Sequence, residues 1–269
     1  MHAQSTWWIG AVLVLCMGTG LACAEGIEAI TKPSEDVTLS FVQAGRIASV
    51  LVKEGDDVKT NQLLVQQDDA ARLVELAQLK AEAEQTVRIR GQEAQLAQKT
   101  VDLHKLEEAF EKKAVSKWDV EHARLEVSMA ELTLELAKFQ RGQSQLKYDQ
   151  TRIEVDRMRL ESPIPGKVEK LFVKPGESAD ALAQVVRVVK IDPLWIEVPV
   201  PLADARKLKV ARAAQVRFPD NPEQPAAGKV IHIGAVADAA SDTLTVRVEL
   251  PNPTGRPAGE RVGVSFPAP

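Results

Sequence analysis

Cysteine is nearly absent from this chain, which removes a whole class of chemistry. Of its 269 residues only Cys16 and Cys23 are cysteines, and both lie in the apolar N-terminal segment. A chain cleaved after Ala24 contains no thiol, so disulfides, thiolate metal sites and cysteine nucleophiles are excluded. Aromatic residues are also scarce, at 4%. This scarcity is typical of a chain in which long exposed helices accompany small compact cores.

The sequence also lacks the signals of an enzyme or a nucleic-acid-binding protein. The 34 lysines and arginines stand against 38 aspartates and glutamates, a net charge of −4 without any basic excess. No G-x-S-x-G, P-loop or G-x-G-x-x-G motif is present. His104 and His122 have neither a cysteine nor a metal-ligand spacing around them. We therefore expect no catalytic residue, no cofactor, no metal and no nucleic-acid partner.

The first 24 residues have the composition of an export segment. Residues 7–24 carry no charge, and they end in Ala22-Cys23-Ala24, a small-x-small pattern that precedes signal-peptidase cleavage. Residues 1–24 are predicted to be a cleaved signal peptide or a retained N-terminal anchor, since about 18 apolar residues can just span a bilayer. Lipidation at Cys23 is a third alternative. Residues 25–36 are expected to be a linker.

Two segments 121 residues apart repeat one another without a gap. Residues 45–56 read GRIASVLVKEGD and residues 166–177 read GKVEKLFVKPGE. Each copy is bounded by glycines and carries β-favouring residues between them, which predicts a short strand followed by a turn. The turn glycines are Gly45, Gly55, Gly166 and Gly176. Neither half has enough apolar residues to stand alone, so residues 37–68 and 160–192 are expected to pack as one small β sandwich.

The segment between the two copies, residues 69–159, has a helical composition. It contains no proline and little glycine, and alanine, leucine, glutamate, glutamine and lysine dominate it. A break is expected near 113–116, where Ser116 and Asp119 have the spacing of a capping box. The sequence therefore predicts an antiparallel hairpin of two helices, each of about 40 residues and roughly 60 Å long.

The second of these helices carries two apolar series. Its first series has small residues at coiled-coil spacing: Val120, Ala123, Val127, Ala130, Leu134 and Ala137. The second recurs every seven residues and includes Leu125, Leu132, Phe139 and Leu146. An offset of two residues places the series on opposite sides of a helix. One series suffices to close the hairpin. The other is either a lateral packing face for a neighbouring copy or the edge of one wide stripe.

From residue 193 onward the hydrophobic period changes to two. Leu244, Val246, Val248 and Leu250 alternate with polar residues, which is typical of a half-buried strand. Residues 251–255 and 257–259 are rich in proline, glycine and asparagine and predict turns. We expect residues 193–269 to form a small β-barrel.

The order of these parts resembles the HlyD/RND-type membrane fusion proteins. The stretches that carry the resemblance are Gly45–Asp68, Leu160–Gly176 with its S-P-I-P-G turn, and Pro251–Phe266. The resemblance implies a split lipoyl-like β sandwich interrupted by a long coiled-coil hairpin and followed by a β-barrel. Because the helical insert replaces the turn that bears the carrier lysine, no lipoyl or biotinyl cofactor is expected. The chain ends directly after the barrel, so the family's membrane-proximal domain is expected to be missing or rudimentary.

The resemblance also implies a function and a set of contacts. It implies a periplasmic adaptor at the inner membrane that joins an inner-membrane transporter to an outer-membrane channel and assembles as a ring, commonly a hexamer. Family members that dock on TolC-like channels carry Arg, Leu and Ser near the hairpin tip. Here Ser116 matches the Ser, Lys105 stands in place of the Arg, and Ala109 replaces the Leu, with Phe110 and Val115 beside them. The alternative is a self-assembling envelope scaffold or lipoprotein without a transport partner. The substrate, the pump class and the channel have no signal in the sequence.

Overall fold

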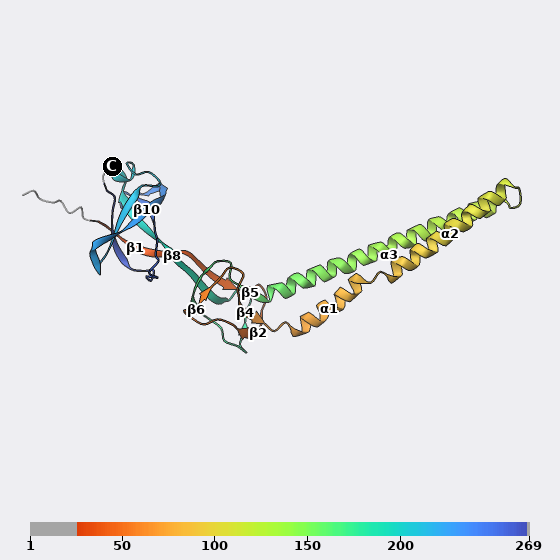
Figure 1. Ribbon diagram of the computed structural model, residues 1–269, viewed down its shortest axis with the longest axis horizontal. Helices are drawn as coiled ribbons and strands as arrows, with labels where there is room; N and C mark the ends of the chain where they lie inside the picture. The colour runs from red at the N-terminus through yellow and green to blue at the C-terminus, as the bar shows by residue number, and fades with distance from the viewer. Residues whose placement is uncertain (1–25, 268–269) are drawn as a thin grey trace, which may run out of the picture. The chain divides into compact units, whose positions relative to one another are not determined.

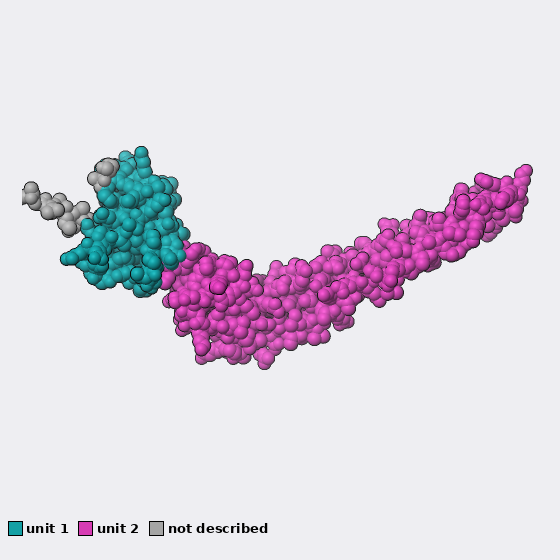
Figure 2. All heavy atoms as spheres, in the orientation of Figure 1, with its two compact units in different colours: residues 1–32, 192–269 teal, residues 33–191 magenta. Residues whose placement is uncertain are grey.

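The protein has a mixed α and β fold, as the sequence predicts. The computed structural model describes residues 26–267, and this part of the chain forms two compact units (Figure 2). One unit joins the N-terminal residues up to Lys32 to residues 192 onward, and the other comprises residues 33–191. The strands β1 (Ile27–Ser40) and β8 (Gln184–Pro201) each contribute to both units.

The first unit is a closed antiparallel sheet. The start of β1 pairs with β12 (Arg261–Ser265), and the order continues through β9 (Ala213–Phe218), β10 (Asn221–Asp238) and β11 (Thr243–Leu250) to the end of β8. A further pairing of β1 with β8 returns the strand order to its start. A short helix, α4 (Leu202–Ala205), follows β8. The sheet is therefore a small barrel, visible in Figure 1 around the labels β1 and β10.

The period-two residues of these strands form the barrel core. Val246 and Val248 on β11 face inward and are fully buried, as are Ile196 and Val198 on β8. The intervening residues stay partly exposed, so the alternation in the sequence corresponds to the two faces of the sheet. The prediction of buried strands in this region is confirmed.

The expectation of a linker over residues 25–36 is wrong. β1 begins at Ile27 and pairs with β12 in the register Ile27↔Val264 to Ile30↔Arg261. The segment hides its strand signal because two of its buried residues, Thr31 and Ser34, are polar. The Thr31 hydroxyl accepts hydrogen bonds from the backbone N–H groups of Gly259 and Glu260, which replaces the water that it loses on burial.

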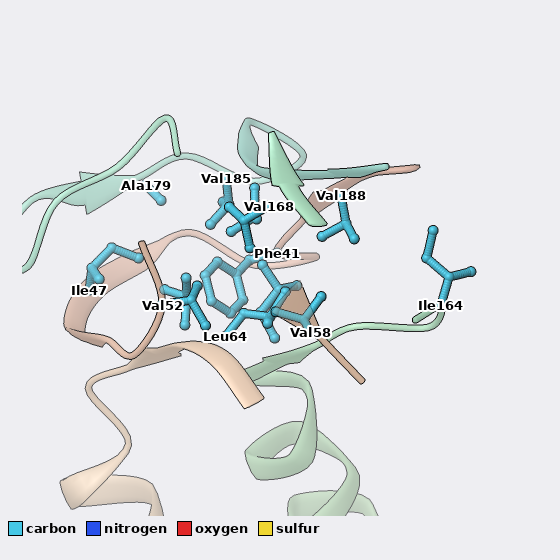
Figure 3. Close-up of a cluster of buried hydrophobic side chains, with 13 residues drawn as sticks. Phe41, Ile47, Val52, Val58, Leu64, Ile164, Val168, Ala179, Val185 and Val188 are labelled. Atoms are coloured by element: carbon cyan, nitrogen blue, oxygen red, sulfur yellow. The ribbon is translucent and has the colours of Figure 1, made fainter. Parts of the chain in front are cut away.

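The β part of the second unit is built from both copies of the repeat. β2 (Gly45–Val50) pairs with β4 (Leu63–Gln67) and β7 (Ser178–Ala179), and β4 pairs with β5 (Arg159–Glu161). β6 (Gly166–Leu171) pairs with β3 (Asp57–Val58) and with β8. Side chains from both halves meet in one buried cluster that includes Phe41, Ile47, Leu64, Val168 and Val185 (Figure 3). The prediction that the halves share one core is confirmed.

The two copies hold each other by reciprocal backbone hydrogen bonds. The Gly55 N–H donates to the Val168 carbonyl, and the equivalent Gly176 N–H donates to the Ile47 carbonyl, both at 2.8 Å. In each pair the donor and the acceptor shift by 121 residues, the period of the sequence repeat. The two halves therefore form equivalent hydrogen bonds to one another. Each turn glycine donates its N–H to a backbone carbonyl in a strand of the opposite copy, so that this carbonyl has a partner.

The four predicted turn glycines serve two different purposes. Gly55 and Gly176 have φ values of 91° and 88°, a region that residues with a Cβ rarely adopt. Gly45 and Gly166 allow close approach instead, because a Cβ on Gly166 would lie 2.4 Å from the Val189 carbonyl oxygen and one on Gly45 would lie 2.9 Å from Gln67 Nε2. All four positions therefore have a steric reason to be glycine.

Between the two halves run three helices, where two were predicted. α1 (Ala70–Glu84) and α2 (Val87–Glu111) follow one another, and α3 (Lys117–Arg157) returns antiparallel to both (Figure 1). The expectation of one continuous outgoing helix is wrong, because Gln85 is extended at ψ 117° and interrupts it. The Arg141 side chain on α3 donates through Nε to the Ala83 carbonyl at 3.3 Å beside the break. At 1.5 Å per residue α3 alone is about 60 Å long.

Candidate functional site: the arm and its tip

The arm formed by α1, α2 and α3 is closed by the small-residue series on α3. Five of the six residues of this series are buried, as the spacing predicts: Val120, Ala123, Ala130, Leu134 and Ala137. The sixth, Val127, is half-buried. Small side chains at these positions let the helices approach closely, since little volume separates their backbones. Ion pairs flank the seam, with Lys99 Nζ 2.9 Å from Glu126 Oε2 and Arg124 Nη2 2.8 Å from Glu107 Oε1.

The second series on α3 faces solvent along the length of the helix. The four side chains named for lateral packing are between 58% and 65% exposed: Leu125, Leu132, Phe139 and Leu146. Met129, Leu136 and Ile153 extend the same exposed surface. We call these seven residues the outer stripe. A continuous row of large apolar side chains in water is unusual for a monomer and marks an interaction surface.

The tip is a tight turn defined at both ends by backbone hydrogen bonds. At the end of α2 the Ala114 N–H donates to the Ala109 carbonyl at 2.9 Å, and the Lys113 N–H donates to the Phe110 carbonyl at 2.8 Å. These two bonds make a Schellman motif, with Lys113 at the left-handed position, φ 57°. That position is usually occupied by glycine.

α3 begins with the predicted capping box. The Asp119 N–H donates to Ser116 Oγ at 3.3 Å, while the Ser116 N–H donates to Asp119 Oδ2 at 2.8 Å. The Ser116 hydroxyl also donates to Asp119 Oδ2 at 2.7 Å. These hydrogen bonds from the side chain and backbone of Ser116 lower the pKa of Asp119 from its usual 3.8. The turn is therefore a defined structure and presents its side chains in fixed directions.

The structure places the predicted tip residues unequally. Ser116 caps α3, and Phe110 is 44% exposed at the end of α2. Val115 is half-buried within the turn, and Ala109 is half-buried in the last turn of α2. Lys105 is exposed but lies well inside α2, before Ala109. Ser116, Phe110 and Val115 are therefore brought together, while Lys105 is not part of the turn.

Sequence reasoning missed the most exposed aromatic side chain of the tip. Trp118 directly follows the capping serine, is 67% exposed, and has its ring centroid 5.1 Å from that of His122. The signal was available, because a tryptophan in the first turn of a helix is conspicuous in a chain with 4% aromatic residues.

The described residues contain no group of three or more histidine, cysteine, aspartate or glutamate side chains that could hold a metal ion. His104 Nε2 lies 3.2 Å from Glu108 Oε1 on its own helix. Between residues 26 and 267, none of the helices combines the length and hydrophobicity needed to span a membrane.

Comparison with known proteins agrees with this architecture. Residues 193–261, which form most of the barrel, match the family described as CusB-like, beta-barrel domain. These residues therefore carry the β-barrel domain of that family, and the chain as a whole is similar to membrane fusion proteins. The fold of the chain is similar to that of the MacA crystal structure from Actinobacillus actinomycetemcomitans, with a TM-score of 0.71 over 89% of this chain and 78% of that one, at 16% identity.

Two curated relatives extend the likeness beyond the barrel. The macrolide export protein MacA of Escherichia coli O157:H7 is 23% identical over 224 residues, covering 79% of this chain and 59% of that protein. The multidrug resistance protein MdtA of Xenorhabdus bovienii (strain SS-2004) is 23% identical over 229 residues, covering 82% and 52%. The chain thus spans between half and three fifths of these relatives.

Proposed function

We propose that the chain is a periplasmic adaptor that links an inner-membrane transporter to an outer-membrane channel in tripartite efflux or secretion. The observation that carries this proposal is the arm. A helix of 41 residues leads to a turn with exposed aromatic and basic side chains, on a protein with the barrel of a membrane fusion protein. Such an arm has no catalytic use and suits contact with a partner about 60 Å from its base.

Each part of the chain has a role in this proposal. Residues 1–24, which lie outside the described residues, are the export signal or anchor that directs the protein to the periplasmic side of the inner membrane. Residues 37–68 and 160–192 are the two halves of a lipoyl-like domain. Residues 69–159 are the arm, and residues 193–269 together with the start of β1 are the barrel.

The outer stripe supports assembly of several copies. Its residues are large, apolar and exposed, and they run along the side of the arm opposite to the buried seam. A neighbouring arm would cover them and remove apolar surface from water, at about 25 cal/mol per Å². We propose that copies pack side by side through Leu125, Leu132, Phe139 and Leu146 in a closed ring, of which a hexamer is one size.

The same stripe also favours a second candidate, a self-assembling envelope scaffold without a transport partner. The two functions differ at the tip. An adaptor needs a specific partner there, whereas a scaffold needs only its own copies along the arm.

The experiment is photo-crosslinking in cells from the tip of the full chain. A photoreactive residue at Ala114 leaves the Ser116–Asp119 box intact, and the same residue at Glu93, an exposed position on α2, is the matched control. We expect an adduct between position 114 and one outer-membrane protein, identified by mass spectrometry and absent at position 93. Adducts with the protein itself alone, at normal export, would support the scaffold and contradict the adaptor.

A further inference from the structure

Lys113 has a backbone conformation that its side chain does not favour. It holds the left-handed position of the Schellman motif at φ 57°, where the Cβ of any L-residue crowds the backbone and glycine is the relaxed choice. Residues held in such conformations cluster at functional sites, where the side chain has a use that offsets the strain. The question is therefore what a lysine contributes at the outermost point of the arm.

Lys113 is one of three exposed lysines at the turn. Lys112 and Lys117 flank it, and no acidic residue lies between position 112 and position 118. Of the three, Lys117 has its Nζ 3.2 Å from Glu121 Oε1, an exposed ion pair on α3. The nearest carboxylate that follows, Asp119, is held by the hydroxyl and the backbone N–H of Ser116. Next to this basic group lie the rings of Phe110 and Trp118, which are 44% and 67% exposed. The turn thus combines a local positive charge with two exposed aromatic side chains.

We propose that Lys112, Lys113, Lys117 and Trp118 are the specificity-determining contacts of the tip, and that their partner is a protein surface with an apolar notch rimmed by carboxylates. This inference rests on the proposed adaptor function and names the chemistry that the channel end must present. Trp118 is the anchor, because a large ring that leaves water on binding dominates an interface. The lysines select partners by charge and speed their encounter.

The charge distribution behind the turn favours a compact protein surface over a lipid bilayer. Between positions 104 and 124 the five basic residues are balanced by five acidic ones, among them Glu107, Glu108, Glu111 and Glu121. An extended anionic surface acts over a Debye length of about 8–10 Å, so it would attract the lysines and repel these acids together. A small rim of carboxylates on a protein would act only on the side chains of the turn itself. There the lysines have no acidic residue between them, so the attraction would not be offset by repulsion.

The test uses adduct yield from the photoreactive residue at Ala114 in the full chain. Lys113→Gly, Lys112→Glu with Lys117→Glu, and Trp118→Ala should each reduce the yield of the channel adduct by about fivefold or more. Lys113→Gly should do so while the midpoint of thermal unfolding stays the same or rises, because glycine relaxes the turn. Lys113→Arg, which keeps the charge, should retain the adduct. The matched control is Lys138→Glu with Lys147→Glu on the exposed side of α3, which should leave the yield unchanged.

The outcomes separate this inference from the proposed function. A channel adduct that survives Lys113→Gly and Trp118→Ala unchanged would overturn the inference and leave the adaptor function standing. No channel adduct from the parent chain would overturn both. Binding of the purified protein to phosphatidylethanolamine–phosphatidylglycerol vesicles that is lost in Trp118→Ala, with the channel adduct unchanged, would assign the tip to a lipid surface and also overturn the inference.

Discussion

Asn61 and Leu182 occupy equivalent left-handed positions in the two copies of the repeat. They lie 121 residues apart, with φ values of 60° and 62°, and each donates its N–H to a carbonyl of the other half, Asn61 to Ser162 at 2.7 Å and Leu182 to Phe41 at 2.8 Å. Asparagine tolerates this conformation, whereas leucine is strained in it. The Leu182 side chain is 73% exposed, so no burial offsets the strain.

Replacing Leu182 by asparagine should therefore stabilise the protein. We expect Leu182→Asn to raise the free energy of unfolding by about 1 kcal/mol, and Asn61→Leu to lower it by a similar amount. The measurement is chemical denaturation of both variants. Ala181→Asn, at the exposed neighbouring position without a positive φ, is the control and should not stabilise. A destabilised Leu182→Asn would mean that the leucine makes a contact that outweighs its strain.

The capping box should control the order of the first turn of α3. Ser116→Ala removes the acceptor of the Asp119 N–H and should weaken this helix end by about 1 kcal/mol, the usual loss for a capping serine. Hydrogen exchange of the amides of residues 117–120 measures it, and exchange elsewhere in the arm should not change. Ser128→Ala, at an exposed mid-helix position, is the matched substitution and should leave these amides protected.

The same box should depend on pH through Asp119. Its pKa is lowered by the hydrogen bonds from Ser116, so the folded state favours the charged form. The stabilisation is complete above the unfolded pKa, near 3.8, and is lost as pH falls through the lowered folded pKa. The protection of the amides of residues 117–120, relative to their intrinsic exchange rate at each pH, should fall below about pH 4. In Asp119→Asn this protection should be low already at neutral pH, and equal acid sensitivity in both proteins would contradict this mechanism.

Glu197 should make the barrel sensitive to acid. Hydrogen bonds from Lys32 at 2.5 Å and from Arg247 at 2.9 Å lower the pKa of Glu197 from its usual 4.5. Because the folded pKa is the lower one, the stabilisation is present above about pH 4.5 and is lost as pH falls below it.

Glu197→Gln should therefore lower the midpoint of thermal unfolding at pH 6.5. The difference in midpoint between the variant and the parent chain should become smaller as pH falls toward 3. Glu223→Gln, at an exposed position of β10, is the matched neutralisation and should leave the midpoint unchanged. A difference for Glu197→Gln that stays constant across this range would show that the carboxylate charge does not matter.

The outer stripe should drive self-association. Leu132→Lys with Phe139→Lys places two charges where apolar side chains would be buried, and each such side chain is worth about 1.5–3 kcal/mol when covered. We expect the association constant to fall by at least about a hundredfold, measured by sedimentation velocity, with helical circular dichroism unchanged. Thr133→Lys with Gln140→Lys, at exposed polar positions of α3 outside the outer stripe, adds the same charge at the same seven-residue separation and should leave association intact.

The two apolar series of α3 show what helical periodicity can and cannot predict. Spacing alone placed Val120 and Leu134 on one face and Leu125 and Leu132 on the opposite one, and the structure buries the first pair and exposes the second. The small side chains of the first series indicated close helix packing. Periodicity says nothing of what covers the exposed face, since a lone chain contains no information on a neighbour's position.

Features that depend on local chemistry could be predicted from the sequence alone. Neighbouring residues in the sequence are enough to predict three of them: the 121-residue repeat, the left-handed turn at Gly55 and the capping box at Ser116. Features whose hydrogen-bond partners lie far along the chain became visible only in the folded protein. β1 is a strand because β12 supplies its hydrogen bonds, more than 230 residues later. The Arg141 guanidinium lies against the carbonyl of Ala83, before the break between α1 and α2, 58 residues earlier. Backbone groups need a partner wherever the chain is packed, and a partner that far away leaves no pattern in the residues beside it.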